Sequence, residues 1–213
     1  VLALGGHQKN ALAVGGAGRI VAGPYIGDLD SVLARERFAA ATQSLPALAG
    51  CQPTQLACDL HPDYASSQWA AADPRPTEAI QHHHAHVAAV LAEHGLAGEV
   101  LGVAFDGAGL GDDGTLWGGE FLLGDCRQVR RAAWLRPFPL PGGERAAREP
   151  RRSALGLLYG AYGPGLGGET LDFTADERRT LLQALERGIN TPLTSSVGRL
   201  FDAVAALLGL CQV

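Results

Sequence analysis

The order of short apolar runs and glycine-rich turns constrains the fold more than any other feature of this sequence. Near the start of the chain, strands are expected over residues 1–4, 11–14 and 19–23, with a glycine turn after the first. The same order recurs later, with strands expected over residues 100–106, 115–123 and 128–138. This is a repeat of topology and not of residues. Two such units predict a two-lobed α/β protein that binds a ligand in the cleft between its lobes.

Helical and connecting segments fill the rest of the chain. Helices are expected over residues 31–45, 66–72, 82–94, 144–162, 176–188 and 200–210, with a further strand at 54–59 and an extended segment at 78–81. Residues 46–53 are expected to connect two elements, and residues 163–168 form a glycine-rich break. Asp30 or Ser31 is expected to cap the first helix, and Asp28 belongs either to a capping turn or to a site.

Composition excludes several classes of protein. The chain has 213 residues, of which 46% are hydrophobic and 18% charged, as is usual for a globular domain. A net charge of −5 argues against a nucleic-acid partner. Neither a membrane-spanning run nor a signal peptide is recognisable, and the four cysteines lack a C-x-x-C pair, so a cytoplasmic protein is expected. Because the chain contains no methionine, it is expected to be part of something longer.

A histidine cluster is the strongest candidate for a functional site. Four of the seven histidines lie within residues 82–86, and His82 and His86 are one helical turn apart. Asp106 follows an apolar strand that is expected to be buried. Two imidazoles and one carboxylate suit iron(II), zinc or manganese, although histidines also occur for structural reasons. A zinc metalloprotease is disfavoured because its motif needs Glu at the position of His83.

Glycine turns and hydroxyl groups suggest anion binding near this cluster. Amides in the turn that contains Gly107, Gly109 and Gly111, and in the turn at Gly5 and Gly6, can approach a phosphate. The first turn also holds Lys9, the only lysine, which is either a phosphate contact or a solvated side chain. Ser195, Ser196 and Gly198 precede a helix and either bind an anion or cap that helix.

Several stretches, taken together and in order, resemble one known family. They are VLALGGHQKN (1–10), IGDLD (26–30), DLHPDY (59–64), QHHHAH (81–86), FDG (105–107), WGGEF (117–121) and TSSVGRLFDAVAALLG (194–209). This combination, which covers the whole chain, is similar to the carboxy-terminal Kae1-like region of the hydrogenase maturation factor family HypF. The resemblance implies an actin-like (ASKHA, RNase H-like) two-lobed α/β fold, with residues 1–99 as the first lobe and 100–213 as an incomplete second lobe.

The family resemblance also implies a reaction and its participants. HypF proteins make carbamoyl-adenylate from carbamoyl phosphate and ATP, and transfer the carbamoyl group to the C-terminal cysteine of HypE. That group becomes the cyanide ligand of the [NiFe]-hydrogenase iron. By similarity His82, His86 and Asp106 would hold a divalent metal, iron or zinc, and would act in catalysis together with Lys9. The nucleotide and phosphate contacts would be Gly5, Gly6, Lys9, Asn10, Gly107, Gly109, Gly111, Ser195, Ser196 and Arg199.

Two departures from the family and two alternatives accompany this interpretation. The family has threonine where this chain has Ala108, and its adenylate-forming region is expected to lie outside this sequence. The first alternative is a stand-alone O-carbamoyltransferase that modifies antibiotics. The second is a metal- or nucleotide-binding fragment without catalysis. No nucleic-acid or membrane partner is expected.

Overall fold

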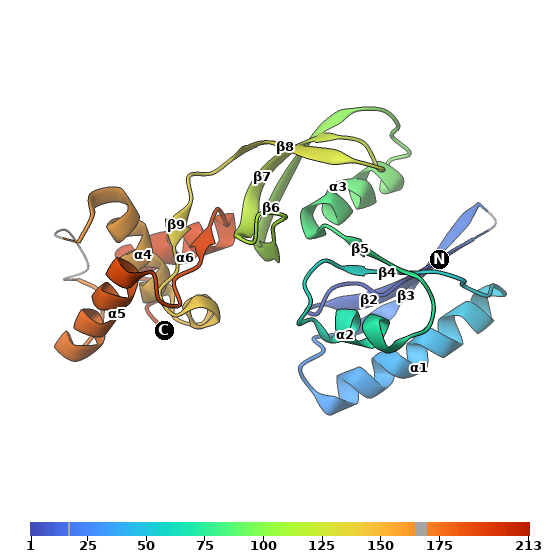
Figure 1. The fold of residues 1–213 in the computed structure, drawn as a ribbon, viewed down its shortest axis with the longest axis horizontal. Helices are drawn as coiled ribbons and strands as arrows, with labels where there is room; N and C mark the ends of the chain where they lie inside the picture. The colour runs from blue at the N-terminus through green and yellow to red at the C-terminus, as the bar shows by residue number, and fades with distance from the viewer. Residues whose placement is uncertain (17, 165–169) are drawn as a thin grey trace. The chain divides into compact units, whose positions relative to one another are not determined.

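The computed structural model describes residues 1–16, 18–164 and 170–213 of the chain (Figure 1). Contacts between residues divide the chain into two compact units, Val1–His82 and His83–Val213. The predicted lobe boundary after residue 99 remains a prediction.

The first unit contains a sheet with the strand order β3-β2-β1-β4-β5. Its strands are β1 (Leu2–Ala3), β2 (Asn10–Gly16), β3 (Arg19–Gly27), β4 (Leu56–Asp59) and β5 (Thr77–Ile80). Strands β1, β2 and β3 pair antiparallel, whereas β4 is parallel to both β1 and β5. The parallel pairs bring the carboxyl ends of β4 and β5 to the same edge of the sheet.

Two helices, α1 (Val32–Ala49) and α2 (Ala65–Ala72), lie on the same side of this sheet (Figure 1). Ser31 caps α1, as its Oγ accepts a hydrogen bond from the amide of Ala34 at 3.1 Å. The helices meet through an edge-on contact between Phe38 and Trp69, whose rings lie 5.8 Å apart. Behind them the core consists mainly of strand residues such as Leu2, Leu12, Val14 and Leu56, together with Leu4 just after β1.

The second unit is built on another sheet, with the strand order β6-β7-β10-β9 and with β8 paired to β7. Its strands are β6 (Val100–Leu110), β7 (Leu116–Gly124), β8 (Val129–Trp134), β9 (Phe138–Pro139) and β10 (Leu193–Thr194). Strands β6, β7 and β8 pair antiparallel, and β10 is parallel to β7. Both units therefore contain an antiparallel three-stranded meander, which confirms the predicted repeat of topology.

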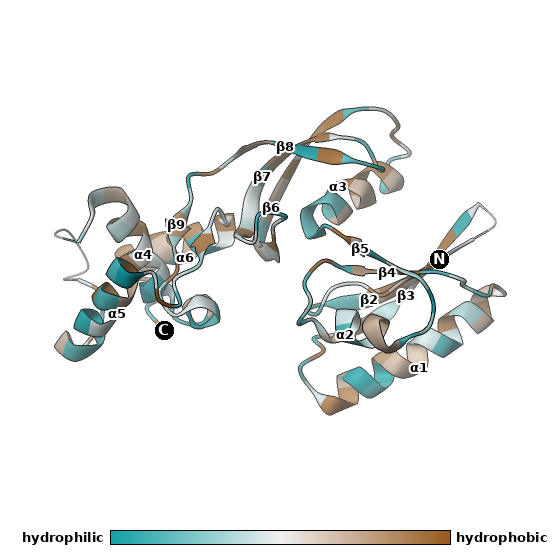
Figure 2. Ribbon diagram, in the orientation of Figure 1, coloured by the Kyte–Doolittle hydropathy of each residue, from teal (hydrophilic) through white to brown (hydrophobic). Residues whose placement is uncertain are grey.

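The helices of the second unit pack on this sheet and on one another. They are α3 (His82–Glu93), whose first residue closes the preceding unit, the 3₁₀ helix η1 (Gly143–Ala147), α4 (Pro150–Tyr162), α5 (Ala175–Arg187) and α6 (Val197–Leu207). Figure 2 shows mostly hydrophilic residues along α5, which contributes only Leu181 and Leu185 to the buried core. Helices α4, α5 and α6 share one apolar cluster, which includes Leu155, Leu181 and Ala203.

Proline positions correct two of the predicted helix boundaries. Helix α1 was expected to end before Pro46, but it includes this residue and ends at Gly50, whose left-handed backbone supplies the C-cap. Conversely, the single helix predicted over residues 144–162 is divided into η1 and α4. Pro150 takes the first position of α4, where its missing N–H costs nothing. Most of the glycine-rich break predicted at 163–168 lies outside the described residues.

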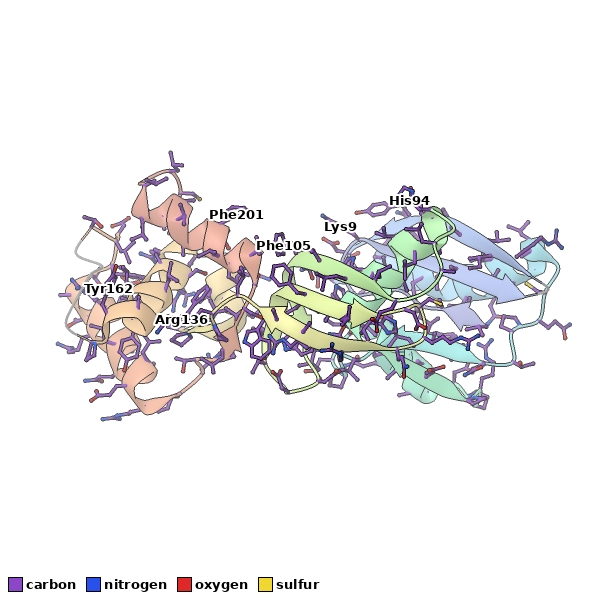
Figure 3. All side chains as sticks on the ribbon, turned by 90° about the horizontal axis from the view of Figure 1, so that it is seen from above. Lys9, His94, Phe105, Arg136, Tyr162 and Phe201 are labelled. Carbon is purple, nitrogen blue, oxygen red and sulfur yellow. The ribbon has the colours of Figure 1, made fainter. Side chains whose placement is uncertain are left out.

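The burial predicted for strand β6 is also wrong on one of its faces. Leu101, Val103 and Phe105 are more than half exposed, and Phe105 is labelled in Figure 3 together with Phe201 of α6. The opposite face carries Gly102 and Ala104 and packs inward. A Cβ atom on Gly102 would lie 2.4 Å from Cγ2 of Val87, so α3 approaches the sheet as closely as a glycine allows.

Within the part of the chain that the structure describes, no helix combines the length and the apolar character needed to cross a bilayer. All four cysteines are free thiols.

Candidate metal centre

Helix α3 is held against the sheet of the second unit by one buried stripe. His83, Val87 and Leu91 are each four residues apart, and all are buried. Val87 and Leu91 join Trp117 and Leu122 in an apolar cluster. Since this stripe faces the sheet, the neighbouring stripe, which carries His82 and His86, is directed along the sheet surface.

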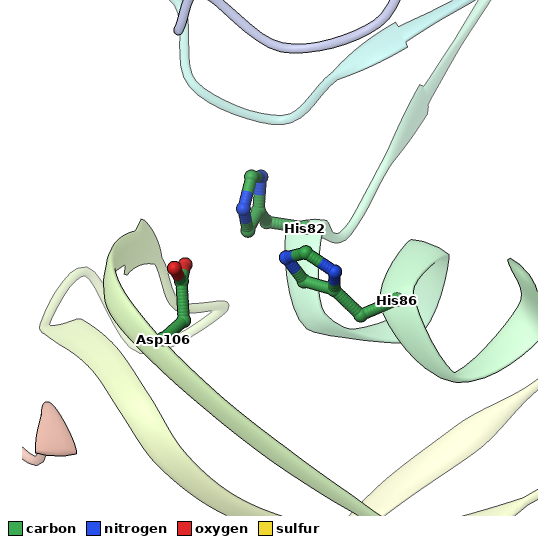
Figure 4. Close-up of side chains that lie close together, drawn as sticks. All are labelled: His82, His86 and Asp106. Carbon is green, nitrogen blue, oxygen red and sulfur yellow. The ribbon is translucent and has the colours of Figure 1, made fainter. Parts of the chain in front are cut away.

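That second stripe meets the aspartate of strand β6. His82, His86 and Asp106 each offer one donor atom, and these atoms all lie within 4.8 Å of one another (Figure 4). His82 and Asp106 are half-buried, and His86 is exposed. Two imidazole nitrogens and a carboxylate oxygen are a chemically suitable donor set for a divalent transition metal. The three residues that the sequence singled out therefore do lie together, and they can hold a metal ion.

Asp106 is oriented by its surroundings within the second unit. One carboxylate oxygen accepts a hydrogen bond of 2.6 Å from the amide of Gly107. The other lies 3.7 Å from Nε2 of His83, whose ring is fully buried and lies 6.0 Å from the ring of Trp117. His83 therefore lies behind the cluster, beside one of the candidate ligands.

The turn before α6 braces the backbone that carries Asp106. Ser196 Oγ donates toward the carbonyl oxygens of Asp106 and Gly107, at 2.9 and 2.6 Å. The same oxygen caps α6 by accepting a hydrogen bond from the amide of Arg199 at 3.1 Å. The helix-cap interpretation of Ser196 is therefore confirmed, and the cap reaches across to strand β6.

A buried polar network supports this turn from behind. Glu120 is fully buried and accepts hydrogen bonds from Arg131 Nε, at 2.6 Å, from the hydroxyl of Ser195 and from two backbone amides. Burial alone would raise the pKa of Glu120, but the hydrogen bonds from Arg131 and Ser195 lower it below the ordinary value. The guanidinium of Arg131 lies 4.2 Å and 4.3 Å from the ring centroids of Trp117 and Trp134. The network is charged, and its buried carboxylate is fully hydrogen-bonded.

Arg199 lies next to the Asp106 turn. A Cβ atom on Gly107 would be 3.9 Å from Nη2 of Arg199. Its Nη1 forms an ion pair of 3.0 Å with Asp202 one turn further along α6. Burial raises the pKa of Asp202, and the charge of Arg199 offsets part of that rise. The structure therefore brings a half-buried cation close to the candidate metal ligands.

The second glycine turn, predicted over residues 107–111, is mostly strand, because β6 continues to Leu110. Its glycines have packing roles. Gly109 pairs with Trp117 in the β6–β7 ladder, and the amide of Gly111 donates to the carbonyl of Thr115 at 2.9 Å. A Cβ atom on Gly111 would lie 2.0 Å from the Trp117 indole nitrogen. The amides of Gly107 and Gly111 are thus bonded within the chain, and a phosphate-facing role for this turn remains a prediction.

The first glycine turn belongs to the first unit. Asn10 is buried there, and its amide group donates to the carbonyls of Leu4 and Gly6 at 2.8 and 2.6 Å, so its side chain shapes the turn. Gly5 has a positive φ of 65°. Lys9 also has a positive φ, 48°, and its backbone amide donates a hydrogen bond to Asp28 at 2.7 Å. The side chain of Lys9 is exposed to solvent (labelled in Figure 3). A Cβ atom on Gly6 would lie 3.9 Å from the ring of His82.

Several residues around the centre carry no pattern in the sequence that would single them out. Nδ1 of His82 lies 2.6 Å from a carboxylate oxygen of Asp59 at the end of β4. Glu120 and Arg131 are equally unforeseen. For Asp59 the only signal is its place at the carboxyl end of a strand, where α/β proteins often bind ligands. For Glu120 the only signal is that a charged residue stands within the otherwise apolar and glycine-rich strand β7.

By comparison with known families, the chain is in the class of Kae1-like carbamoyltransferase domains. Two family models match the chain: "HypF Kae1-like domain" over residues 1–93, and "Carbamoyltransferase, Kae1-like Domain, second subdomain" over residues 102–213. The second covers more than half of the sequence. The chain belongs to the HypF family of carbamoyltransferases.

Individual relatives agree with this assignment. Carbamoyltransferase HypF of Rhodobacter capsulatus is 45% identical over 100% of this chain and 30% of its own length, and HypF of Synechocystis is 40% identical over 99% and 30%. The crystal structure of full-length HypF in the phosphate- and nucleotide-bound form matches with a TM-score of 0.94 at 37% identity, over 100% of this chain and 34% of the other. The predicted α/β, actin-like fold is confirmed. The chain spans about a third of the length of these relatives.

Proposed function

We propose that this chain is the part of a HypF carbamoyltransferase that transfers the carbamoyl group. The observation that carries the proposal is the meeting of His82, His86 and Asp106 within 4.8 Å in a chain of this family. The donor would be carbamoyl-adenylate, made from carbamoyl phosphate and ATP, and the acceptor would be the C-terminal cysteine of HypE. The product would serve cyanide-ligand synthesis in [NiFe]-hydrogenase maturation.

The transfer has a simple bond balance. The cysteine sulfur forms a bond to the carbamoyl carbon, the bond from that carbon to the adenylate phosphate oxygen breaks, and AMP leaves. The thiol proton goes to solvent or to a base. A divalent iron or zinc ion, when bound, supplies Lewis-acid polarisation of a carbonyl or phosphoryl oxygen.

The residues of the chain would have separate parts in this reaction. His82, His86 and Asp106 would hold the ion, and the Ser196 cap and buried His83 would keep Asp106 in position. Arg199, close to Gly107, and Lys9, with its side chain in solvent, would contact the phosphate of the adenylate. These parts are supported by position and charge.

Metal content of anaerobically purified protein tests the proposal first. Iron or zinc near one equivalent is expected in the parent protein. His82→Ala and Asp106→Ala are expected to lose it, because each removes one of three donors. His94→Ala is the matched control, since this exposed histidine follows α3 and lies outside the cluster. A folded parent without metal, or equal metal in all four proteins, would contradict the proposed centre.

Carbamoyl transfer is tested separately by mass spectrometry of HypE, incubated with this chain and carbamoyl-adenylate. We expect the C-terminal cysteine to be carbamoylated in the presence of the parent or of His94→Ala. It should stay unmodified in the presence of His82→Ala. A chain that binds metal but does not accelerate transfer would instead support the non-catalytic binding fragment. The stand-alone O-carbamoyltransferase would modify a hydroxyl-bearing small molecule in place of the cysteine.

A further inference from the structure

A buried carboxylate stands directly behind one of the candidate metal ligands. Asp59 Oδ2 lies 2.6 Å from Nδ1 of His82, and only 6% of the Asp59 side chain is exposed. The other oxygen, Oδ1, accepts a hydrogen bond of 2.9 Å from the amide of His61. The backbone carbonyl of Asp59 accepts a further one, of 3.0 Å, from Ser67. The carboxylate is therefore fixed before it meets the imidazole.

Strand register explains why these two residues meet although they are distant in sequence. Strand β4 is parallel to β5, and Asp59 is opposite Ile80. The amide of Leu60 donates to the carbonyl of Ile80 at 3.0 Å, which extends the pairing by one step. His82 begins α3 two residues after Ile80. The end of β4 therefore presents Asp59 to His82, the first residue of α3.

The contact determines which nitrogen of His82 can bind a metal ion. An ionised carboxylate accepts hydrogen bonds and cannot donate them, so Nδ1 must carry the proton. The lone pair of the neutral ring is then on Nε2. Metal-binding histidines commonly donate their second N–H to a carboxylate in this way, which fixes the ring and raises its basicity.

We infer that Asp59 is a positioning residue for metal binding: it holds His82 in the Nδ1-protonated tautomer and directs Nε2 toward the ion. The inference rests on the metal centre of the proposed function and adds a fourth residue to it. Asp59 is not among the three donors and would act through His82. Its removal should weaken binding while the three donor residues stay in place.

Cobalt(II) titration of the metal-free chain under anaerobic conditions tests this role. Removal of a carboxylate partner of this kind costs roughly 10- to 100-fold in metal affinity, so Asp59→Asn should bind cobalt that much more weakly. Asp73→Asn is the matched control. It removes an aspartate of the same unit whose partner is Arg75, 2.8 Å away, and cobalt affinity should not change. His82→Ala should abolish stoichiometric binding.

A histidine NMR spectrum of the ¹⁵N-labelled metal-free protein provides the second readout. His82 should show its proton on Nδ1 in the parent, and this preference should be lost in Asp59→Asn while thermal unfolding shows the variant folded. Asp59→Glu keeps the charge and should bind cobalt more tightly than Asp59→Asn. If Asp59→Asn does not fold, the parent spectrum and Asp59→Glu carry the test.

The outcomes separate this inference from the proposed function. If Asp59→Asn binds cobalt as tightly as the parent and only His82→Ala loses cobalt binding, the metal centre stands and the role of Asp59 is overturned. A proton on Nε2 of His82 in the parent would overturn it too. A folded parent that binds no cobalt would refute the centre as well as this inference.

Discussion

Replacement of Glu120 by glutamine tests the buried network that supports the candidate centre. Glu120 has no exposed surface, and Arg131 Nε donates to it at 2.6 Å. In the variant the guanidinium would lose this charged partner while it remains between Trp117 and Trp134. Removal of one partner from a buried ion pair costs about 3–5 kcal/mol. Arg131 keeps Asp113 as a second, half-exposed carboxylate at 2.9 Å, so we expect the lower end, about 3 kcal/mol.

Calorimetry can measure this cost, because the variant residue lies in only one of the two compact units. For a unit of this size, 1 kcal/mol corresponds to roughly 3 °C, so Glu120→Gln should lower one transition by about 10 °C. Asp176→Asn provides the control. Its ion pair with Arg179 lies on the surface, with side chains 82% and 68% exposed, and should contribute less than about 1 kcal/mol. If both variants lower the transition temperature equally, Glu120 stabilises the fold no more than a surface carboxylate does.

Two further predictions concern acid stability and helix packing. Burial alone would raise the pKa of Glu149, but hydrogen bonds from arginines, Arg152 first among them, lower it from 4.5 to about 2. This depressed pKa stabilises the folded state above about pH 4.5, and the contribution of about 3 kcal/mol is lost as the pH falls toward 2. Urea unfolding at pH 6 and pH 3 should therefore show that the free energy of unfolding depends less on pH in Glu149→Gln than in the parent. An equal change in this free energy between the two pH values in both proteins would contradict the prediction. Gly198→Ala would place a Cβ 2.8 Å from the Cα of Gly107, so despite the better helix propensity of alanine we expect a loss of about 1–3 kcal/mol, measured by thermal unfolding. Gly160→Ala, with its nearest contacts at 3.4 Å, should be nearly neutral, and an equal loss in both variants would refute the packing argument.

Local sequence pattern was sufficient to predict the three candidate donors. The spacing of His82 and His86 fixes one face of a helix, whatever the helix packs against. Pattern predicted a strand over residues 100–106 that ends at Asp106, and this end is wrong: β6 continues to Leu110, and Asp106 lies within it, where the register with β7 shifts between Phe105 and Gly109. The predicted burial of that strand failed because periodicity does not show which faces are covered. Here only the face with Gly102 and Ala104 is covered.

Residues that act through pairing register could not be predicted in this way. Asp59 meets His82 only because Asp59 pairs with Ile80 across two parallel strands. The contact between Glu120 and Arg131 likewise depends on how β7 and β8 align, and their register shifts between Phe121 and Leu122. A register shift of one residue would turn either side chain to the opposite face of its sheet. No local pattern contains that information.

The glycines around Asp106 show how one sequence signal can have two causes. Glycine-rich turns at the ends of strands are typical of phosphate loops. In the second unit, however, a Cβ atom on Gly111 would collide with Trp117, and one on Gly118 would lie 2.6 Å from the carbonyl oxygen of Asp106. One on Gly198 would collide with the backbone of Gly107. Close packing of α6 and β7 on β6 therefore requires small residues whether or not an anion binds. The donor cluster and its supporting residues, unlike the glycines, have chemistry that packing alone does not require, so they are the features that indicate function.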